Sequence, residues 1–254
     1  MKKYLISGDL ELDRPVGGKV SLNIDQGYYF AFILDDIIEK QSDINNMSLW
    51  ADDAAQQMKI SIDTDVLQSL IGQANANNRG PAAGAISHNL NLGVSGAPLA
   101  SVSRDPDVGE IEVIDIILRA GLALDEQNVP EQGRWIVMPT WMTTQIKRSE
   151  LRQVYLSGDG VTMLRNGRLG MVDRFTLYAS NLLPHGTVGG LADGEFAVYA
   201  GHSHALTFAS QITKVETMRS ERTFGDILRG LQVYGHKVLD GKALVEAIVT
   251  QAGA

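Results

Sequence analysis

Residues 122–139 read LALDEQNVPEQGRWIVMP, and this stretch decides how the middle of the chain folds. Its first part ends a run of apolar residues at helical spacing, which predicts an amphipathic helix over about 109–127. The apolar face of that helix is expected to hold Ile111, Ile114, Ile117 or Leu118, and Leu122. The letters RWIVMP that follow, residues 134–139, predict a buried strand that stops at Pro139. The stretch therefore predicts a helix that leads directly into a buried strand.

Further elements are predicted on the C-terminal side of this stretch. A helix is expected from Thr140 to about Tyr155, and short strands over 169–171, 174–179 and 195–200. Residues 215–249 contain the polar run MRSERTFGD, continue with the strand-like LQVYGHKVL, and end in a short helix expected near Lys242 to Val249. Strands and helices are mixed without regular alternation, which indicates the α+β class.

The N-terminal side shows a long helical pattern and several strand patterns. One helix of about 30 residues and about 45 Å is predicted over about 43–74. Its apolar residues recur mostly every four positions: Met47, Trp50, Ala54, Met58, Ile62, Val66 and Leu70. Alternation predicts half-buried strands over 9–13 and 19–25, joined by a turn at Gly17-Gly18. Tyr28 to Leu34 is apolar throughout and predicts a strand that is covered on both sides.

Residues 72–109 separate these two sides of the chain. The segment is rich in Gly, Ala, Asn and Ser and contains Pro81, Pro98 and Pro106. Such a composition does not bury enough apolar area to form a core of its own, so a long flexible loop is expected. Loops of this length are uncommon in compact domains and usually have a function.

Composition limits the class of protein. The chain has 254 residues, of which 44% are apolar and 20% charged, so a soluble and globular protein is expected. No apolar run reaches the ~18 residues of a membrane helix, and MKKYLISGDL lacks the apolar core of a signal peptide, which indicates synthesis in the cytosol. The absence of Cys excludes disulfides and thiolate metal sites.

The net charge of −8 is unevenly distributed. Residues 1–127 carry 9 Lys and Arg against 19 Asp and Glu, whereas residues 128–254 carry 13 against 11. Proteins that bind nucleic acid tightly depend on a basic surface that displaces counterions. The sequence contains no basic cluster of this kind, so tight binding to nucleic acid is not expected.

Ser203 is the strongest candidate for a catalytic residue. Gly201-His202-Ser203-His204-Ala205 follows an expected strand and differs at its last position from the Gly-x-Ser-x-Gly turn of serine hydrolases. Asp226 and His236 follow in the required order but lie only ten residues apart. A polar turn after a strand is therefore favoured over a hydrolase.

Other polar patterns are weak candidates for metal or phosphate chemistry. His202 and His204 would share one face of a strand, with His185 or His236 as unsupported third ligands, so a metal site is not favoured. Asp9, Glu11 and Asp13 have calcium-loop spacing, but the required Gly and the final Glu are replaced by Arg14 and Val20. No phosphate-binding glycine loop occurs. The sequence predicts no catalytic, metal or cofactor site.

Three motifs, taken in order, give the chain a resemblance to a known family. They are Leu124 to Pro139, which contains LDEQNVPEQGR and the strand that ends in Pro; Asp173 to Pro184, which follows Gly-x-Phe-x-x-Tyr-x-Ser-Asn-x-x-Pro with Asp in place of Gly; and Gly230 to Val238. In this order and spacing they resemble the major capsid proteins of tailed bacteriophages, in particular the coat proteins of short-tailed phages. These proteins share the shell fold named for phage HK-ninety-seven. The resemblance covers about residues 16–249.

The resemblance implies a division of the chain into segments. Residues 1–34 look like part of an extended β-loop that reaches over a neighbouring subunit, and 35–109 like the long spine helix of a peripheral domain with a flexible loop. Residues 110–205 look like an axial domain near the capsomer axes, and 206–254 like the return to the long strands of the peripheral domain and the C-terminus. Phe175, Leu177 and Tyr178 are then expected to fill the small core of an axial-domain hairpin that Pro184 ends near a subunit contact. Family members usually have an N-terminal arm before the matched part, so either the protein is short or an upstream part is missing.

The implied function is structural. A major capsid protein assembles with itself into hexamers and pentamers of an icosahedral head that encloses double-stranded DNA, with portal, scaffolding and decoration proteins as partners. The implied location is the capsid shell of the virion, assembled in the host cytoplasm, and no enzymatic activity, cofactor or membrane is expected. Inter-subunit ion pairs are expected between basic residues of the β-loop and acidic residues of a neighbour, which are Lys2, Lys3, Arg14 and Lys19 with Glu216 or Glu221. An encapsulin-like compartment is the alternative within the same fold, and a serine hydrolase that uses Ser203 is the alternative from another class.

Overall fold

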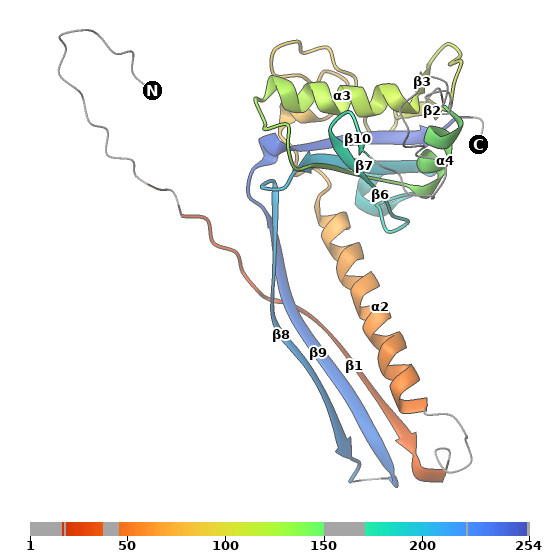
Figure 1. Cartoon of the computed structure of the whole chain (residues 1–254), viewed down its shortest axis with the longest axis vertical. Coiled ribbons are helices and arrows are strands. Elements are labelled where there is room, and N and C mark those ends of the chain that lie inside the picture. The colour runs from red at the N-terminus through yellow and green to blue at the C-terminus, as the bar shows by residue number, and fades with distance from the viewer. Residues whose placement is uncertain (1–16, 18, 38–45, 150–170, 222, 253–254) are drawn as a thin grey trace, which may run out of the picture.

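Two parts of different shape make up the chain in the computed structural model, which describes residues 17, 19–37, 46–149, 171–221 and 223–252. The part that we call the arm consists of three long strands and one long helix, and it projects from the part that we call the head (Figure 1). The head contains residues 70–149, 171–205 and 239–252. The chain therefore combines helices and strands in the α+β manner that the sequence predicts.

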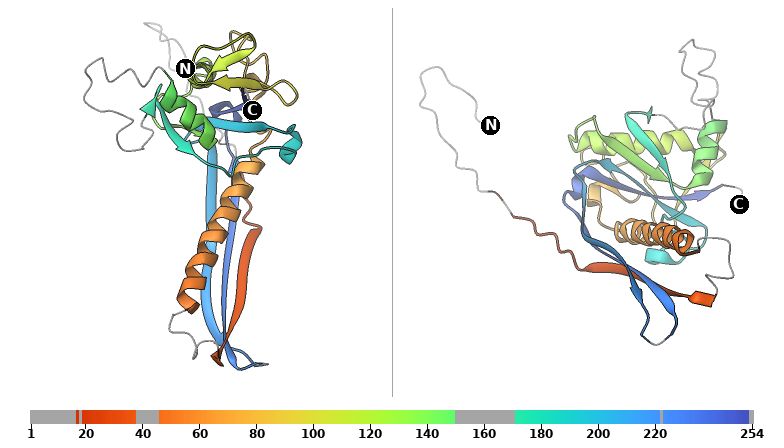
Figure 2. Two further views of the ribbon diagram at one scale, coloured as in Figure 1. Left: turned by 90° about the vertical axis from the view of Figure 1, so that its right-hand side faces the viewer. Right: turned by 60° about the horizontal axis from the view of Figure 1, so that its bottom comes forward.

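The arm is a three-stranded antiparallel sheet with a helix along one face. The strands are β1 (Gln26–Asp35), β8 (Leu206–Arg219) and β9 (Gly225–Val238), in the order β1-β9-β8. The β1–β9 ladder runs from Gln26 opposite Tyr234 to Asp35 opposite Gly225, so it joins a strand from the first part of the sequence to a strand from the last part. Helix α2 (Asn46–Ser69) lies along this sheet in both views of Figure 2. Because α2 covers one face only, the other face of the arm sheet stays open in the single chain.

The head is built on a seven-stranded mixed sheet in the order β3-β2-β10-β7-β4-β6-β5. Strand β10 is central, because it pairs in parallel with β2 and antiparallel with β7. Helix α3 lies across one face of this sheet (Figure 1). The elements of the head are η1 (Ala76–Asn78), β2 (Leu99–Val102), β3 (Glu110–Glu112), α3 (Val113–Glu126), β4 (Arg134–Met138), α4 (Thr140–Arg148), β5 (Met171–Val172), β6 (Phe175–Ala179), η3 (Val188–Gly190), β7 (Glu195–His202), η4 (Gly241–Ala243) and β10 (Leu244–Gln251).

Most of the buried apolar side chains belong to the head. Met138 of β4, Phe175 of β6 and Tyr199 of β7 are each 0% exposed, and they lie in the same core as Leu124 of α3. Full burial of side chains of this size contributes about 1.5–3 kcal/mol each through removal of apolar area from water. The head thus has a core of its own, and the arm is held by fewer, local contacts.

Several elements predicted from the sequence are confirmed. The buried strand in RWIVMP is β4, and its residues Arg134, Ile136 and Met138 are buried. The two strands predicted over 169–171 and 174–179 form the antiparallel β5–β6 hairpin, in which Phe175 and Leu177 are buried but Tyr178 is 54% exposed. The long helix predicted over about 43–74 is α2, which ends earlier, at Ser69. The helix predicted from Thr140 to about Tyr155 is α4, which ends at Arg148 because Ser149 is extended.

The predicted helix over about 109–127 is shorter than expected and presents a different face to the core. It begins at Val113, because Ile111 belongs to β3. Leu118 and Leu122 are 45% and 46% exposed, although they were expected on the buried face. The buried residues of α3 are Val113, Ile116, Ile117, Ala120, Gly121, Ala123 and Leu124.

The short helix predicted near Lys242 to Val249 is wrong. Apart from the single turn of η4, this segment is the central strand β10, with its first six residues buried. A short apolar run of this kind fits a buried strand as well as a helix, and its two neighbouring strands decide the outcome. The length of β8 and β9 was also not predicted, since their alternation is interrupted by polar residues.

Two strand predictions at the N-terminal side also need correction. Residues 19–25 are not a strand, because β1 begins only at Gln26 and Lys237 Nζ donates a hydrogen bond to Ser21 O where a ladder was expected. The strand at Tyr28 to Leu34 is real but is not covered on both sides, since Tyr29 is 78% exposed. The predicted strand over 9–13 and its turn lie outside the described residues.

Residues 72–109 are not a structureless loop. Asn77 O accepts a hydrogen bond from Gly84 N, and an antiparallel bridge joins Ala83 to Leu90. Leu92 is 0% exposed, and β2 extends the head sheet through its pairing with β10. The segment has few large side chains, but it packs against the core of the head instead of forming its own.

In the described part of the chain, no helix is long and apolar enough to span a membrane.

Candidate functional site

A carboxylate on α2 fastens the helix to the arm sheet. The hydroxyl groups of Tyr28 on β1 and Tyr234 on β9 both donate to Asp65 Oδ2, at 2.7 and 2.6 Å. The hydrogen bond to Asp65, followed by burial, raises the pKa of Tyr28. Burial, followed by the hydrogen bond to Asp65, raises the pKa of Tyr234. Both phenols therefore stay protonated and continue to donate over the physiological pH range.

The opposite face of the arm sheet, which we call the open face, is free of the helix. Side chains alternate along a strand, so Tyr29, Ala31 and Ile33 point away from α2, to which Tyr28 is bonded. The ladders continue these positions across the sheet in three rows: Ile33, Ile227 and Met218; Ala31, Arg229 and Glu216; Tyr29, Leu231 and Lys214. The open face therefore has an apolar row near the end of the arm and a charged row beside it.

The exposed apolar side chains of the open face make it a candidate contact surface. Ile33, Leu231 and Met218 are each between 41% and 42% exposed, and Tyr29 is 78% exposed. Single exposed apolar residues are ordinary on protein surfaces, but a contiguous group of them marks an interaction site. The grouping on one face of a projecting sheet is the observation that points to a partner.

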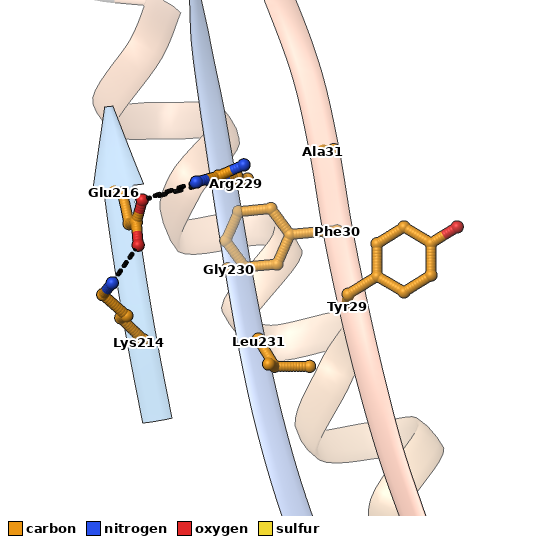
Figure 3. A pocket seen from close by; sticks show the side chains of 8 residues that line it. All are labelled: Tyr29, Phe30, Ala31, Lys214, Glu216, Arg229, Gly230 and Leu231. Atoms are coloured by element: carbon orange, nitrogen blue, oxygen red, sulfur yellow. Dashed lines mark hydrogen bonds and ion pairs between the residues drawn. The ribbon is translucent and has the colours of Figure 1, made fainter. Parts of the chain in front are cut away.

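A shallow hollow of about 580 Å³ lies on this part of the arm (Figure 3). Its charged edge is Glu216, which is paired with Lys214 and, at 2.8 Å, with Arg229 Nη2. Hydrogen bonds from Lys214 and Arg229 lower the pKa of Glu216 to about 2, so it is ionised in all ordinary buffers. The hollow is lined by Tyr29, Phe30, Ala31, Lys214, Glu216, Arg229, Gly230 and Leu231.

A second charged group lies inside the head. The side chain of Arg134 is fully buried, and its Nη2 donates to Asp125 Oδ1 at 2.7 Å and to Val129 O at 2.7 Å. Arg174 Nη2 donates to the other oxygen of Asp125 at 2.8 Å. Burial alone would raise the pKa of Asp125, but the hydrogen bonds from the two arginines outweigh it and the pKa is lowered. This pairing fixes the end of α3 to β4 and to the β5–β6 hairpin, which is a structural role.

The residues predicted to make inter-subunit ion pairs are only partly described. Lys2, Lys3 and Arg14 lie outside the described residues, and Lys19 is exposed. Glu216 is on the open face and already has two cationic partners in its own chain. Glu221 is exposed near the turn between β8 and β9. Among the described residues, Lys19 forms no ion pair with Glu216 or Glu221 within one chain, and the pairing of all these residues between subunits stays a prediction.

The geometry does not bring Ser203 together with the acid and the histidine that the sequence offered for a hydrolase. Ser203 is exposed in the turn between β7 and β8. Asp226 and His236 lie on one strand, β9, ten residues apart, which corresponds to about 33 Å along an extended chain. Asp226 is paired with Arg219 at 3.3 Å. These residues therefore do not form the serine, histidine and acid arrangement that nucleophilic catalysis needs.

The histidines considered as metal ligands have other contacts. The rings of His202 and His204 are 4.3 Å apart, and His204 Nε2 is 3.6 Å from Asp240 Oδ2. His185 stacks on Phe196, and His236 on Tyr234. Within the described residues no group of three or more His, Cys, Asp or Glu side chains is placed to hold a metal ion.

Neither the Asp65 contact nor the Asp125 pair was found from the sequence. Asp65 lies in the middle of the predicted helix, where an acidic residue is usually solvated. Its partners Tyr28 and Tyr234 are distant in sequence, so no spacing reveals the contact. A signal for the Arg134 pair was available in the sequence. Arg134 is a charged residue at the start of a strand that is otherwise apolar, and a buried charge requires a partner of opposite charge.

Comparison with solved structures defines the class of protein. The chain is similar to a structure described as Mycobacterium phage Che8, with 24% identity and a TM-score of 0.65 over 89% of this chain and 71% of that chain. It is similar to the capsid structure of cyanophage P-SCSP1u, with 14% identity and a TM-score of 0.67 over 100% of this chain and 81% of that chain. It is also similar to the SrpI encapsulin of Synechococcus elongatus PCC 7942, with 11% identity and a TM-score of 0.52 over 89% and 74% of the two chains. The fold is therefore the HK-ninety-seven-like shell fold, which the sequence motifs predicted.

A comparison with family models identifies the family within this class. The model described as phage capsid protein matches residues 20–247. No curated protein matches the sequence. The chain belongs to this phage capsid protein family, and it is a structural protein of a phage head shell that assembles with copies of itself.

Proposed function

We propose that the chain is the subunit of an icosahedral phage head that encloses double-stranded DNA and has no enzymatic activity. The observation that carries this proposal is the open face of the arm, with Tyr29, Ile33, Leu231 and Met218 exposed on a part that projects from the head. A single copy leaves these apolar side chains in water. Contacts between copies in a closed shell bury such surfaces, and stable contacts of this kind remove about 1,200–2,000 Å² from solvent.

We further assign the segments as the family resemblance suggests. The arm elements α2, β8 and β9 correspond to a peripheral domain, within the segments 35–109 and 206–254. The head corresponds to an axial domain and takes up β2 and β10 in addition to residues 110–205. Residues 1–34 correspond to part of an extended loop that reaches a neighbouring subunit. The exposed position of Lys19 just before β1 supports that assignment.

The charge of the chain supports DNA as enclosed contents and not as a specific ligand. With a net charge of −8 and no basic cluster, the subunit repels a polyanion at long range. Packaged DNA then moves without being held on the shell. The proposal includes portal, scaffolding and decoration proteins as expected partners. It also includes assembly in the host cytoplasm.

An encapsulin-like compartment is the second candidate within the fold. The similarity to the SrpI encapsulin supports it, but at a TM-score of 0.52 that structure fits less well than the cyanophage capsid at 0.67. The family match to phage capsid proteins favours the phage head.

Electron microscopy of the purified protein tests the proposal. Full-length protein is expressed alone, separated by size-exclusion chromatography and viewed in negative stain. Closed shells or ring-shaped capsomers are expected, and Ser203→Ala is expected to leave their yield unchanged. A compact monomer or dimer at high protein concentration contradicts the proposal, most clearly if it shows an esterase activity that Ser203→Ala removes.

Reversing the charge of Lys19 tests the proposed ion pairs between subunits. The change Lys19→Glu is expected to lower shell yield by about tenfold or more, because like charges at a contact cost several kcal/mol. Adding Glu221→Lys restores opposite charges and is expected to recover the yield. Glu221 is the better partner for this swap, because Glu216 is already paired within its own chain. Unchanged shell yield with Lys19→Glu alone rejects Lys19 as a contact residue.

A further inference from the structure

The arm joins the head through a narrow region that we call the neck, formed by residues 70–75, 203–205 and 239–241. These are the three places where the described chain passes between the two parts (Figure 1). Backbone hydrogen bonds link them: Leu239 N donates to Ala205 O at 2.8 Å, and Asn75 N donates to Gly241 O at 2.9 Å. Apolar contacts add to these bonds, because Leu67 of α2, Leu206 of β8 and Val238 of β9 pack against the core of the head.

Glu246 of the central head strand β10 adds one side-chain contact to the neck. Its Oε2 accepts a hydrogen bond from Gly72 N at 2.7 Å. Gly72 lies just beyond the end of α2, with a φ of 73° that favours glycine. Glu246 is only 8% exposed, so a buried carboxylate of β10 is bonded to the turn that follows α2.

The surroundings of Glu246 contain few other ionisable groups. A cavity of about 320 Å³ adjoins it, and Arg79 is the other ionisable side chain among the described residues that line this cavity. Arg79 Nη1 donates to Gly72 O at 2.9 Å, so it also contacts the neck. Tyr199 of β7 is the cross-strand partner of Glu246, and its buried hydroxyl has no hydrogen-bond partner in the structure.

A second buried glutamate of the same sheet provides a comparison. Both oxygens of Glu195 on β7 accept backbone hydrogen bonds at 2.8 Å, from Gly96 N and Ala192 N. Burial acts to raise the pKa of Glu195, but these bonds outweigh it and the pKa is lowered. For Glu246 the one bond from Gly72 and the charge of Arg79 do not outweigh burial, and the pKa is raised. Two similar side chains therefore respond to pH in opposite directions.

We propose that Glu246 makes the neck pH-sensitive: its contact with Gly72 holds the neck segment that follows α2 on the head sheet more firmly when the carboxyl group is protonated than when it is ionised. Only the consequence for shell assembly rests on the proposed function, because the angle between arm and head decides how a subunit fits its neighbours in a shell. The contact itself is a property of the single chain.

The direction follows from the two states of the neck. When the neck opens, Glu246 meets water and takes the ordinary glutamate pKa of about 4.3. In the closed neck its pKa is higher, so the closed state binds protons more readily. The stability that Glu246 contributes to the closed state is therefore fully present at pH values below the ordinary glutamate pKa. It is lost as the pH rises through the higher value of the closed state.

Hydrogen exchange of the Gly72 amide tests the proposal, because this N–H is the donor to Glu246. The full-length chain is measured at about pH 5 and about pH 8, and protection factors are corrected for the intrinsic pH dependence of exchange. Protection of Gly72 is expected to be higher at the lower pH, since the closed state binds protons more readily than the open state. Equal protection at both values, or lower protection at the acidic one, rejects the proposal.

Three variants separate this effect from general loss of structure. Glu246→Gln keeps an amide oxygen for Gly72 N but cannot ionise, so protection is expected to be high and equal at both pH values. Arg79→Gln removes the neighbouring cation and is expected to move the pH dependence to higher pH. Glu195→Gln is the matched control and is expected to keep the difference of the unmodified chain at Gly72. A pH dependence that persists in Glu246→Gln overturns the proposal, whether or not the protein forms shells.

Discussion

Replacing Asp125 with asparagine is expected to lower the free energy of unfolding of the subunit by about 3 kcal/mol. The change leaves the guanidinium of Arg134, whose side chain is fully buried, without its counterion. It also removes the charge that Arg174 contacts at 2.8 Å. The estimate is at the lower end of the range for broken buried pairs because the side chain of Asp125 itself is 36% exposed and partly screened. Urea unfolding followed by tryptophan fluorescence measures the difference.

Glu131→Gln is the matched control for this prediction. Glu131 Oε1 is 3.0 Å from Arg174 Nη1, but its side chain is 70% exposed, so a loss below about 1 kcal/mol is expected. Because the pKa of Asp125 is lowered in the folded chain, its stabilisation is present above the ordinary aspartate range and is lost as pH falls through the folded value. The Asp125→Asn variant should therefore show a smaller loss of stability on acidification. Equal losses for the two variants at neutral pH contradict the argument.

Replacing Asp65 with alanine is expected to detach α2 from the arm sheet and to cost about 2–3 kcal/mol. The hydroxyl of Tyr234, a residue that is 0% exposed, loses its acceptor, and Tyr28 loses the same partner. A buried donor without an acceptor bears the full cost of leaving water. Hydrogen exchange along α2 is expected to increase, while exchange of the head strands stays unchanged.

Asp63→Ala is the control, because Asp63 is an exposed acidic residue on the same helix. It is expected to leave both exchange and stability within about 0.5 kcal/mol of the unmodified chain. If assembly depends on a rigid arm, Asp65→Ala should also reduce shell yield while the isolated subunit stays folded. Normal exchange along α2 in Asp65→Ala shows that apolar contacts such as Phe32 with Trp50 suffice to hold the helix.

The fold class and the elements around residues 122–139 could be predicted from the sequence because they depend on local patterns. The strand ending at Pro139 and the hairpin around Phe175 are buried in the head, and their apolar residues are contiguous. The long helix α2 was also predicted, although its apolar face meets the sheet through only a few side chains. The order of the three motifs was enough to predict the shell fold.

The remaining errors arise where distant segments decide the structure. Leu244 to Gln251 became a strand because β2 and β7 flank it, and these begin 145 and 49 residues earlier, at Leu99 and Glu195. Residues 19–25 alternate like a strand but have no ladder in the described chain. The sequence did not show that one face of β1 is open. An apolar strand with one face exposed in the single chain has the same run of apolar residues as a strand that is buried on both faces.

The candidate surfaces were less predictable than the fold. Glu216 was named from the sequence as an inter-subunit residue, but its pairing with Arg229 depends on the register of β8 and β9. Glu246 was overlooked because it was placed on a helix, where it would be solvated. Contacts of this kind become visible only after the register of each strand is known.

The ladder between β1 and β9 has a consequence for synthesis on the ribosome. Its closest partners in sequence, Asp35 and Gly225, are 190 residues apart. At translation rates of about 5–20 residues per second, β1 waits roughly 10–40 s for its partner strand to be made. During this interval Tyr28, Phe30 and Phe32 have neither β9 nor a completed arm to cover them. The head sheet is completed later still, because β10 follows β9 in the sequence, but β1 has the longer delay, and a chaperone that binds apolar segments has a long opportunity there.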